Sequence, residues 1–494
     1  MKSVLVTALG VLVTLAAAGC TASHPDVYGL PLGGPTAGCP ETTLSPTARM
    51  ASAASAKKPA ASPEESSAVE EAPTAALEAP AAEDLEGPLT LEQCVDLALS
   101  NNPDIAQQQW DTETALAETD IAEGALWPTV HGQGGLMHYR EDRLIKPRRP
   151  GGRDVLGFSD NLLFGEVVLG MPLYTGGRLR NQVRAAELLT RSAGQRLAHS
   201  RMELVFNVSS VFYSMLGQKE AIDSLLFSQK ALLEHQKRTR ELLQAQKAAR
   251  VDLLRTEVRL ADIEQQLLRE RNVLDVQRFV LASLLGLEKR SVAIQGTLTM
   301  DDVPGSLDDA LAKALSHRQD YQSLASAVEA QRKRLEAAKA GRLPEVSLQA
   351  SYGSRWDSDD VDEDNEVGRV GVLIDVPVFE GGRIDARIRR ERTRLSAQEQ
   401  ALRKRRLQIQ VEVETATSNI ESTRARVGVT QKAVEQAKES LRIEREKYEL
   451  AKGAIVDVLD AQSALLGSQM NYYRALADYN TALAQFRLAV GEAR

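Results

Sequence analysis

The sequence contains few aromatic, cysteine and histidine residues. Aromatic side chains make up 4% of the 494 residues, and there are three cysteines and six histidines. So few large side chains do not fill a thick globular core. By contrast, a charged fraction of 26% with abundant Ala, Glu, Leu, Arg and Gln is typical of long helices and coiled coils. The composition therefore predicts a mainly helical protein.

Residue patterns typical of a catalytic, metal or nucleotide site are also missing. The histidines are scattered, and His131 and His138 lie seven positions apart on a predicted strand, where they face opposite sides. No His-Glu-x-x-His, P-loop or nucleophile-elbow pattern is present, and the methionines do not cluster as in a copper site. We therefore expect no enzymatic activity, no cofactor and no metal. A net charge of −8 gives no reason to expect a nucleic-acid partner.

Long hydrophobic runs are absent too. The apolar run at residues 4–15 is too short for a membrane-spanning helix, and with Lys2 before it and small residues after it, residues 1–19 predict a secretion signal. Cys20 directly after Ala-Gly resembles a bacterial lipoprotein signal, so we expect it to be acylated; simple cleavage is the alternative. Residues 20–88 predict a disordered Ala- and Pro-rich tether. Cys39 and Cys94 either pair or remain two free thiols.

The remaining chain contains two similar halves. An offset of 205 positions relates three pairs of residues: Asp252 and Asp457, Gly176 and Gly381, and Gly286 and Gly491. Further upstream an offset of 216 relates Leu91 to Leu307 and Pro128 to Pro344. We interpret this pattern as an internal duplication, with repeat 1 at residues 89–300 and repeat 2 at residues 301–494.

Each half predicts helices followed by a pair of strands. The helical pattern starts at Leu89 and stops at Pro128 or Pro344, after which the apolar period changes from 3.6 to 2. The return strands are predicted at residues 162–173 and 367–378. Each of the four strands is expected to have about ten residues, a length that crosses a bilayer when the strand is tilted. Because strands in lipid tolerate no open edge and four strands do not close a barrel, several chains must share one.

The predicted hairpin tips differ in charge. Residues 140–153 are basic and residues 357–366 are acidic. We interpret both as solvated loops. The alternatives are that the two loops bind each other across protomers, or that the acidic loop binds cations.

A very long helix follows each hairpin. The second runs from Gly382 to Ala451, about 70 residues or roughly 100 Å. Its apolar residues recur every seven positions, as at Ile420, Val427 and Leu441, and form a narrow stripe that fits a helix in a curved wall. The return helix after Asp457 is about half as long, so one full-length helix is expected to pack against two shorter ones.

The doubled order of these features resembles the TolC family of outer-membrane efflux proteins. The resemblance runs from about Leu89 to Gly491. Its most specific segments are LEQCVDLALSNNPD at residues 91–104, Gly-Gly-Arg at residues 176–178 and 381–383, and VDVLDAQ at residues 456–462. It implies a homotrimer with a twelve-stranded barrel in the outer membrane of a Gram-negative bacterium, continued by a helical tunnel across the periplasm. Such a duct passively conducts substrates that an inner-membrane pump delivers through a periplasmic adaptor.

The resemblance also implies roles for the second helical turn. Asp457 and Asp460 match positions that carry acidic rings at the closed periplasmic end of family members. Carboxylates three positions apart share a helix face, and a threefold axis gathers each into a ring that favours cations. We therefore expect a pore constriction at Asp457 and Asp460; ordinary exposed carboxylates are the alternative. Adaptor docking is expected at the tips, which carry Arg250, Asp252, Gly453 and Ile455.

A second class of function is a lipid-anchored periplasmic coiled-coil scaffold without a pore. It predicts the same long helices but no membrane strands, so the alternating segments at residues 346–350 and 370–376 distinguish the two hypotheses.

Overall fold

The computed structural model describes residues 87–146, 157–246, 249–288, 292–300, 307–357, 366–450 and 452–492. These residues all belong to one of two units of the chain, Ala75–Arg494. The predicted signal and tether, with Cys20 and Cys39, lie outside the described residues, as do the loops at 147–156 and 358–365. The described elements are α2 (Leu91–Asn101), α3 (Pro103–Gly124), β1 (Thr129–Lys146), β2 (Gly157–Tyr174), α4 (Arg178–Gln244), α5 (Arg250–Leu284), α6 (Leu307–His317), α7 (Gln319–Ala340), β3 (Glu345–Asp357), β4 (Glu366–Asp375), α8 (Arg383–Glu449) and α9 (Ile455–Val490).

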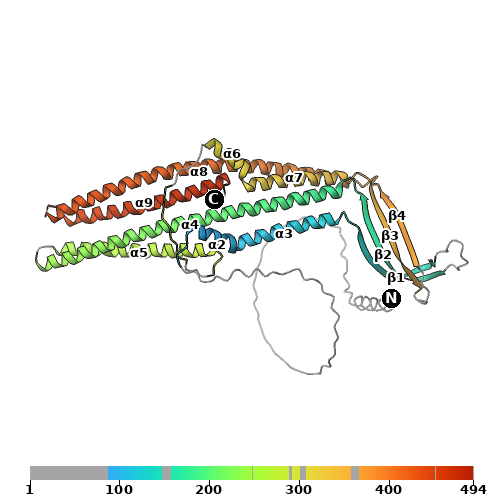
Figure 1. Ribbon diagram of the computed structural model, residues 1–494, viewed down its shortest axis with the longest axis horizontal. Coiled ribbons are helices and arrows are strands. Elements are labelled where there is room, and N and C mark those ends of the chain that lie inside the picture. Colours follow the sequence, from blue (N-terminus) through green and yellow to red (C-terminus); the bar gives the residue numbers. More distant parts are fainter. Residues whose placement is uncertain are drawn as a thin grey trace, which may run out of the picture. The chain divides into compact units, whose positions relative to one another are not determined.

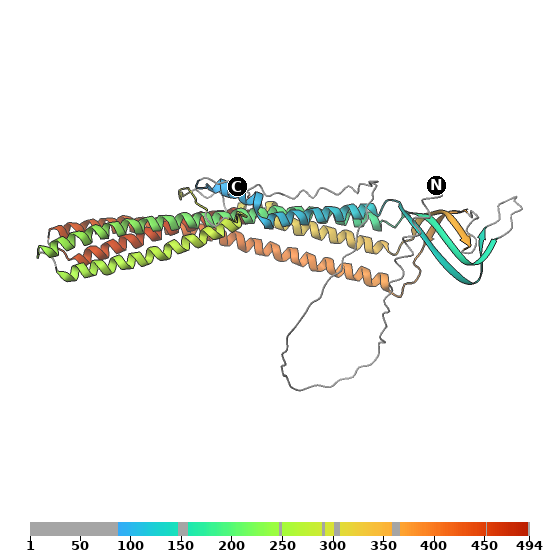
Figure 2. The same cartoon turned by 90° about the horizontal axis from the view of Figure 1, so that it is seen from below.

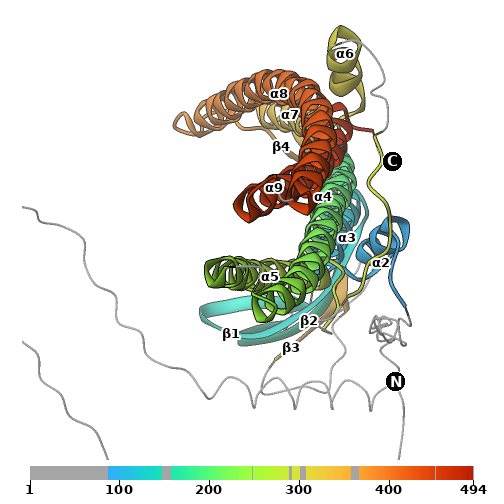
Figure 3. The same ribbon diagram turned by 90° about the vertical axis from the view of Figure 1, so that its left-hand side faces the viewer.

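The fold is mainly helical with one small antiparallel sheet, as the composition and periodicity predict. The long helices α4 and α8 have 67 residues each, and α5 and α9 have 35 and 36. Helix α4 packs against α3 and α7 next to the sheet and against α5 and α9 farther away, while α8 packs against α7 and α9 (Figure 1). This arrangement confirms that a full-length helix lies along two shorter ones, as α8 does along α7 and α9, and α4 lies along two such pairs. Figures 2 and 3 show that α3, α4, α5, α7, α8 and α9 form a single curved row, with α2 and α6 outside it.

Local sequence signals set the helix boundaries. Thr90 and Gln93 form a capping box at α2, in which Thr90 Oγ1 accepts from the Gln93 N–H and Gln93 Oε1 accepts from the Thr90 N–H. Asn102 ends α2 and caps α3, since its Oδ1 accepts from the Asp104 N–H at 2.9 Å, and Pro103 occupies the first position of α3. These contacts position the helices that lead into the sheet.

The helix row encloses thin apolar seams. In α8 the predicted heptad residues Ile420, Val427 and Leu441 are 3%, 2% and 6% exposed, which confirms the stripe. They pack mainly on α9, where Tyr479 is fully buried. Most other α8 residues face solvent, as expected for a helix that is wet on one side.

Corresponding helices in the two halves begin after a glycine or end before one, and the paired glycines have similar φ angles. Gly177 and Gly382 precede α4 and α8 with φ angles of 84° and 81°, and Gly286 and Gly491 follow α5 and α9 with φ angles of 68° and 80°. A Cβ on Gly286 would lie 2.3 Å from the backbone oxygen of Asn101, so no other residue fits there without displacing α2. The predicted offset of 205 positions therefore pairs residues of equal conformation.

The four strands form one sheet in the order β1-β2-β3-β4, and both outer strands have a free edge within the described residues. Strands β1 and β2 have 18 residues each, β3 has 13 and β4 has 10. The prediction of ten-residue strands is thus wrong for the first hairpin. Pairs such as Arg143 with Ser159 extend it into the segment predicted as a basic loop, because strand pairing uses backbone groups and does not require apolar side chains. Val376 lies outside β4, which ends at Asp375.

The strand register gives the two faces of the sheet different chemistry. One face is mostly apolar and carries, from β1 to β4, Val130, Leu136, Leu163, Val167, Leu169, Met171, Tyr352, Ala350, Leu348, Val346, Val370, Val372 and Ile374. The other face is more polar and carries Gln133, Glu166, Gln349, Arg355 and Arg369 with His131, Ser347 and Ser351, beside the apolar Met137, Phe164, Val168 and Leu373. Asn161 and Glu366 lie on the mostly apolar face. On the more polar face Gln133 donates to Glu166 and Arg369 donates to Ser351 Oγ at 2.9 Å.

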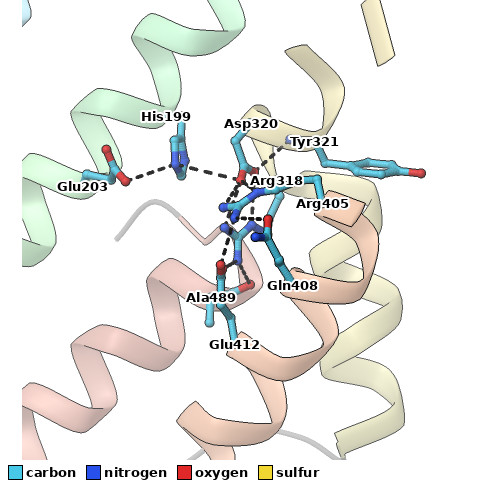
Figure 4. Close-up of polar contacts among 9 residues, drawn as sticks. All are labelled: His199, Glu203, Arg318, Asp320, Tyr321, Arg405, Gln408, Glu412 and Ala489. Atoms are coloured by element: carbon cyan, nitrogen blue, oxygen red, sulfur yellow. Dashed lines mark hydrogen bonds and ion pairs between the residues drawn. The ribbon is translucent and has the colours of Figure 1, made fainter. Parts of the chain in front are cut away.

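A buried ionic cluster joins α4, α8 and α9 at the start of α7 (Figure 4). Arg318, 3% exposed, donates to both carboxylate oxygens of Asp320 at 3.1 and 3.0 Å and to Glu412 and the carbonyl of Ala489. Arg405 of α8 also binds Asp320. Burial would raise the pKa of Asp320, but its hydrogen bonds and ion pairs outweigh that effect and lower it to about 2. Asp320 therefore stays ionised, and the charged hydrogen bonds of the cluster hold the start of α7 against the neighbouring helices.

The corresponding junction of the first half uses a neutral residue. Asn102, 216 positions before Arg318, donates from Nδ2 to the carbonyl of Leu284 at 2.9 Å. Arg318 makes the matching contact with the carbonyl of Ala489 at 3.3 Å. Both side chains therefore connect a short helix to the end of a return helix, and the offset of 216 also pairs structurally equivalent residues.

Candidate functional site

The predicted site lies at the start of α9, at the end of the helix row far from the sheet (Figure 1). Helix α9 starts at Ile455 after an extended Ala454. Ala454 has no side-chain oxygen to cap the helix, and Asp457 Oδ2 accepts from the Ala454 N–H at 3.3 Å. Asp457 is thus both exposed and oriented by the backbone, and its negative charge lies near the positive end of the helix dipole.

Asp460 lies one turn later on the same exposed surface. Its Oδ1 is 3.5 Å from Nη2 of Arg259 on α5, and its side chain is 68% exposed. An ion pair this exposed contributes little stability, but it shows that α5 and α9 approach each other at the tip. Arg259 is not predictable from the sequence, because its position on α5 relative to α9 follows from packing and not from any spacing along the chain.

The turn before α9 packs tightly. The Lys452 N–H donates to the Lys447 carbonyl at 2.8 Å, and a Cβ added to Gly453 would lie 3.1 Å from Cβ of Lys447. Gly453 therefore allows the chain to fold back closely on the last turn of α8. Its role in binding a partner stays a prediction.

The other predicted docking residues differ in exposure. Ile455 is 3% exposed and packs in an apolar cluster with Leu441 and Leu459, so its side chain holds the tip together. Arg250 is exposed at the first position of α5, and Asp252 is half-buried near His235 and Tyr448. Burial and two nearby arginines lower the pKa of His235, which favours its neutral form beside the Tyr448 ring.

A shallow groove of about 400 Å³ separates α5 from α9 at the tip. Arg259 and Asp460 line one part of it, and exposed apolar residues of α5 line the other. Val251, Leu254 and Val258 are 47%, 49% and 64% exposed, which is unusual for aliphatic side chains on one helix face. The tip therefore combines carboxylates with an uncovered apolar surface.

The described residues contain no group of His, Cys, Asp or Glu side chains that would hold a metal ion. Cys94 is buried in α2 as a free thiol, and burial raises its pKa to about 11. Among the helices that the structure describes, none combines the length and the apolar character needed to cross a membrane.

Comparison with known proteins gives a consistent result for sequence and fold. The outer membrane protein TolC of Vibrio cholerae is 21% identical over 410 residues, which cover 81% of this chain and 90% of TolC. The alkaline protease secretion protein AprF of Pseudomonas aeruginosa is 24% identical over 303 residues, which cover 60% of this chain and 63% of AprF.

Solved structures of outer-membrane proteins share the fold. VceC of Vibrio cholerae has a TM-score of 0.69 at 18% identity, covering 82% of this chain and 96% of its own. The outer membrane channel CmeC of Campylobacter jejuni has a TM-score of 0.69 at 18% identity, covering 81% and 85%. The curved helix row with its small sheet is therefore the fold of these solved structures.

The sequence profile of the family described as outer membrane efflux protein matches residues 94–287 and 310–492. The chain belongs to this family, whose members are transport channels and not enzymes. The resemblance inferred from the sequence motifs is thus confirmed.

Proposed function

We propose that this protein is the outer-membrane exit duct of a tripartite efflux or secretion system. Three copies form a twelve-stranded barrel in the outer membrane of a Gram-negative bacterium and a helical tunnel across the periplasm. An inner-membrane pump delivers substrates through a periplasmic adaptor at the helical tips, and the duct conducts them passively to the exterior.

The amphipathic sheet is the observation that carries this proposal. Its apolar face includes Val370, Val372 and Ile374, which are 76%, 60% and 63% exposed in a single chain. Its opposite face carries Glu166 and Arg369. An apolar face suits contact with lipid and a polar face suits a water-filled lumen, the alternation expected of a transmembrane barrel.

The free edges of the chain support closure with other copies. Strands β1 and β4 have one unpaired edge each among the described strands, and open edges are not stable in a bilayer. The outer helices also expose apolar side chains, with Trp110 of α3 58% exposed, Leu268 of α5 70% exposed and Val411 of α8 61% exposed. The two ends of the helix row therefore present different surfaces. A contact between one end of a chain and the opposite end of the next chain is head-to-tail, and such contacts can close into a ring. The number three comes from the family resemblance.

The tip residues support a constriction in the closed duct. Asp457 and Asp460 are exposed on the same face of α9, so a threefold axis near that face would bring six carboxylates together. Such rings favour cations and repel anions. The groove between α5 and α9 and the exposed Arg250 offer the adaptor an apolar and charged surface, with Asp252 and Gly453 shaping the turns around it.

Two further parts of the proposal rest on the sequence. An acylated Cys20 would hold the start of the mature chain in outer-membrane lipid. An internal duplication explains why both halves have the same element order and nearly equal helix lengths. The scaffold alternative predicts helices without membrane strands, and the four-stranded sheet argues against it.

Cysteine accessibility in outer membranes tests the assignment of the two faces. A membrane-impermeant maleimide should label Gln349→Cys on the polar face and leave Val372→Cys on the apolar face unlabelled. A lipid-soluble maleimide should label Val372→Cys. The unsubstituted protein measures the background from its own cysteines. Equal labelling of both variants by the impermeant reagent would contradict a lipid-facing sheet.

A further inference from the structure

A groove of about 520 Å³ crosses four helices next to the sheet. The ends of α3 and α7 and the starts of α4 and α8 line it, and these segments lie side by side where they meet the strands (Figures 1 and 2). Ala185, Leu189 and Ala337 supply an apolar floor. The polar lining consists mainly of arginines, namely Arg178, Arg334, Arg387, Arg390 and Arg394.

Three of these arginines have carboxylate partners. Arg178 donates to both oxygens of Glu345 at 2.8 and 2.9 Å, an approximately neutral pair. Glu391 accepts from Arg390 at 2.7 Å and from Arg394 at 3.1 Å, so one carboxylate serves two guanidinium groups. The three-residue group around Glu391 therefore keeps one excess positive charge.

The two remaining arginines have no carboxylate partner among the described residues. Neither Arg334 nor Arg387 takes part in an ion pair there, although both line the groove. Glu118 is the one other acidic residue of the lining. Five arginines thus face three carboxylates once Glu345 is included, which leaves two positive charges uncompensated over an apolar floor.

A groove lined by four neighbouring helices fits the inner side of a curved row, where side chains converge, better than the outer side, where they diverge. On α4, Gln182, Ala186 and Leu189 belong to the groove, whereas Arg180 and Arg184 are exposed outside it. In the proposed trimer this inner side is the wall of the lumen.

We propose that the groove binds a soluble amphiphilic organic anion, whose carboxylate, sulfonate or phosphate group is held by Arg334 and Arg387. The assignment to the lumen rests on the proposed function, whereas binding by the groove itself does not. Guanidinium groups form paired, charge-assisted hydrogen bonds with such anions, and the alanine and leucine floor contacts the apolar body of the ligand. The site would retain anionic substrates on the exit side of the duct, beyond the acidic tip.

Fluorescence titration with a matched pair of probes tests this proposal. Dansylglycine and dansylamide share the same fluorophore, but only dansylglycine carries a carboxylate. The full-length protein in non-ionic detergent should bind dansylglycine more tightly than dansylamide. The preference should be strong at about 0.01 M salt and weak at about 1 M, where the screening length falls from about 30 Å to about 3 Å. Arg334→Gln with Arg387→Gln should weaken dansylglycine binding about fivefold and leave dansylamide unchanged.

Matched variants and competitors make the outcome specific. Arg184→Gln with Arg389→Gln removes two arginines of α4 and α8 that do not line the groove, and it should leave dansylglycine binding unchanged. Inorganic phosphate should displace dansylglycine, and phosphatidylglycerol should displace it no better than phosphatidylcholine. Equal losses in both double variants, or displacement by phosphatidylglycerol alone, would overturn the proposal, the latter by assigning the groove to lipid headgroups.

Failure of this inference is distinguishable from failure of the proposed function. A protein that conducts ions in a bilayer but binds both probes equally would be a duct without an anion site. If the protein shows the arginine-dependent preference but never conducts ions, the anion site is supported and the proposed duct is contradicted.

Discussion

Protonation of Asp320 should lower the free energy of unfolding, because it weakens the junction between α4, α7, α8 and α9. The side chain of Asp320 is 11% exposed, and its two oxygens accept from Arg318 and Arg405 while His199 lies 4.0 Å away. Because these partners lower the pKa from 3.8 to about 2, the carboxylate contributes stability above pH 4 that is lost as the pH falls through 2. At 1.36 kcal/mol per unit, the contribution is about 2 kcal/mol.

Asp320→Asn isolates this contribution, because the amide has nearly the same shape as the acid but carries no charge. It leaves the buried guanidinium of Arg318 with Glu412 as its remaining carboxylate, so the free energy of unfolding should fall by about 3 kcal/mol at about pH 6. Chemical denaturation followed by far-ultraviolet circular dichroism, at one protein concentration throughout, measures the difference between the two proteins.

That difference should shrink by about 2 kcal/mol between about pH 6 and about pH 2, since the unsubstituted protein loses the ionised carboxylate over this range. Asp478→Asn is the control, because its pair with Arg426 has side chains 54% and 50% exposed and should cost under about 1 kcal/mol. A difference that stays constant from pH 6 to pH 2 would refute the assignment of the stability to the ionised form of Asp320.

Three further predictions follow from the tip, the helix ends and the buried thiol. Replacing Asp457 and Asp460 together by Asn should lower the cation selectivity of the channel severalfold without changing its oligomeric mass, as measured by reversal potential in a salt gradient. Gly286→Ala should destabilise the protein by over about 1 kcal/mol in thermal denaturation, because its φ of 68° and the backbone of α2 leave no room for a Cβ. Cys94 should resist maleimide at about pH 8 in the folded protein and react on unfolding, because its pKa is about 11.

Matched changes serve as controls for these predictions. Asp111→Asn on the exposed side of α3 should leave ion selectivity unaltered, in contrast to the tip variant. Gly467→Ala in the interior of α9 should stabilise the protein by up to about 1 kcal/mol, because no atom lies within 4 Å of the added methyl group. Rapid labelling of Cys94 in the folded protein would contradict the packing of α2.

The parts of the fold that the sequence predicted are those with a regular period or an obligatory turn residue. The seven-residue stripe through Ile420 and Val427 depends on neighbours in the chain, and it was confirmed. The capping box at Thr90 and the glycines at the starts of α4 and α8 are equally local features. Strand length in the first hairpin was not predictable in this way. Strand length depends on pairing between residues such as Arg143 and Ser159, and no pattern of neighbouring residues in the sequence indicates this pairing.

The candidate site shows the same division. Asp457 and Asp460 were predicted from the resemblance of residues 456–462 to the family, but Arg259 and the groove arginines were not predicted. Arg334 and Arg387 lie on different helices, and only packing of the helix row brings them to one surface. Side chains that meet through tertiary packing leave no spacing signal in the sequence.

Single-channel conductance of the purified full-length protein in a planar bilayer, with the oligomeric mass of the same sample, tests the proposed duct most directly. The account predicts small, cation-selective steps from a trimer, because Asp457 and Asp460 would line the closed tip of the proposed duct. A well-folded helical protein that never conducts, and whose mass is that of a monomer or dimer, would contradict it.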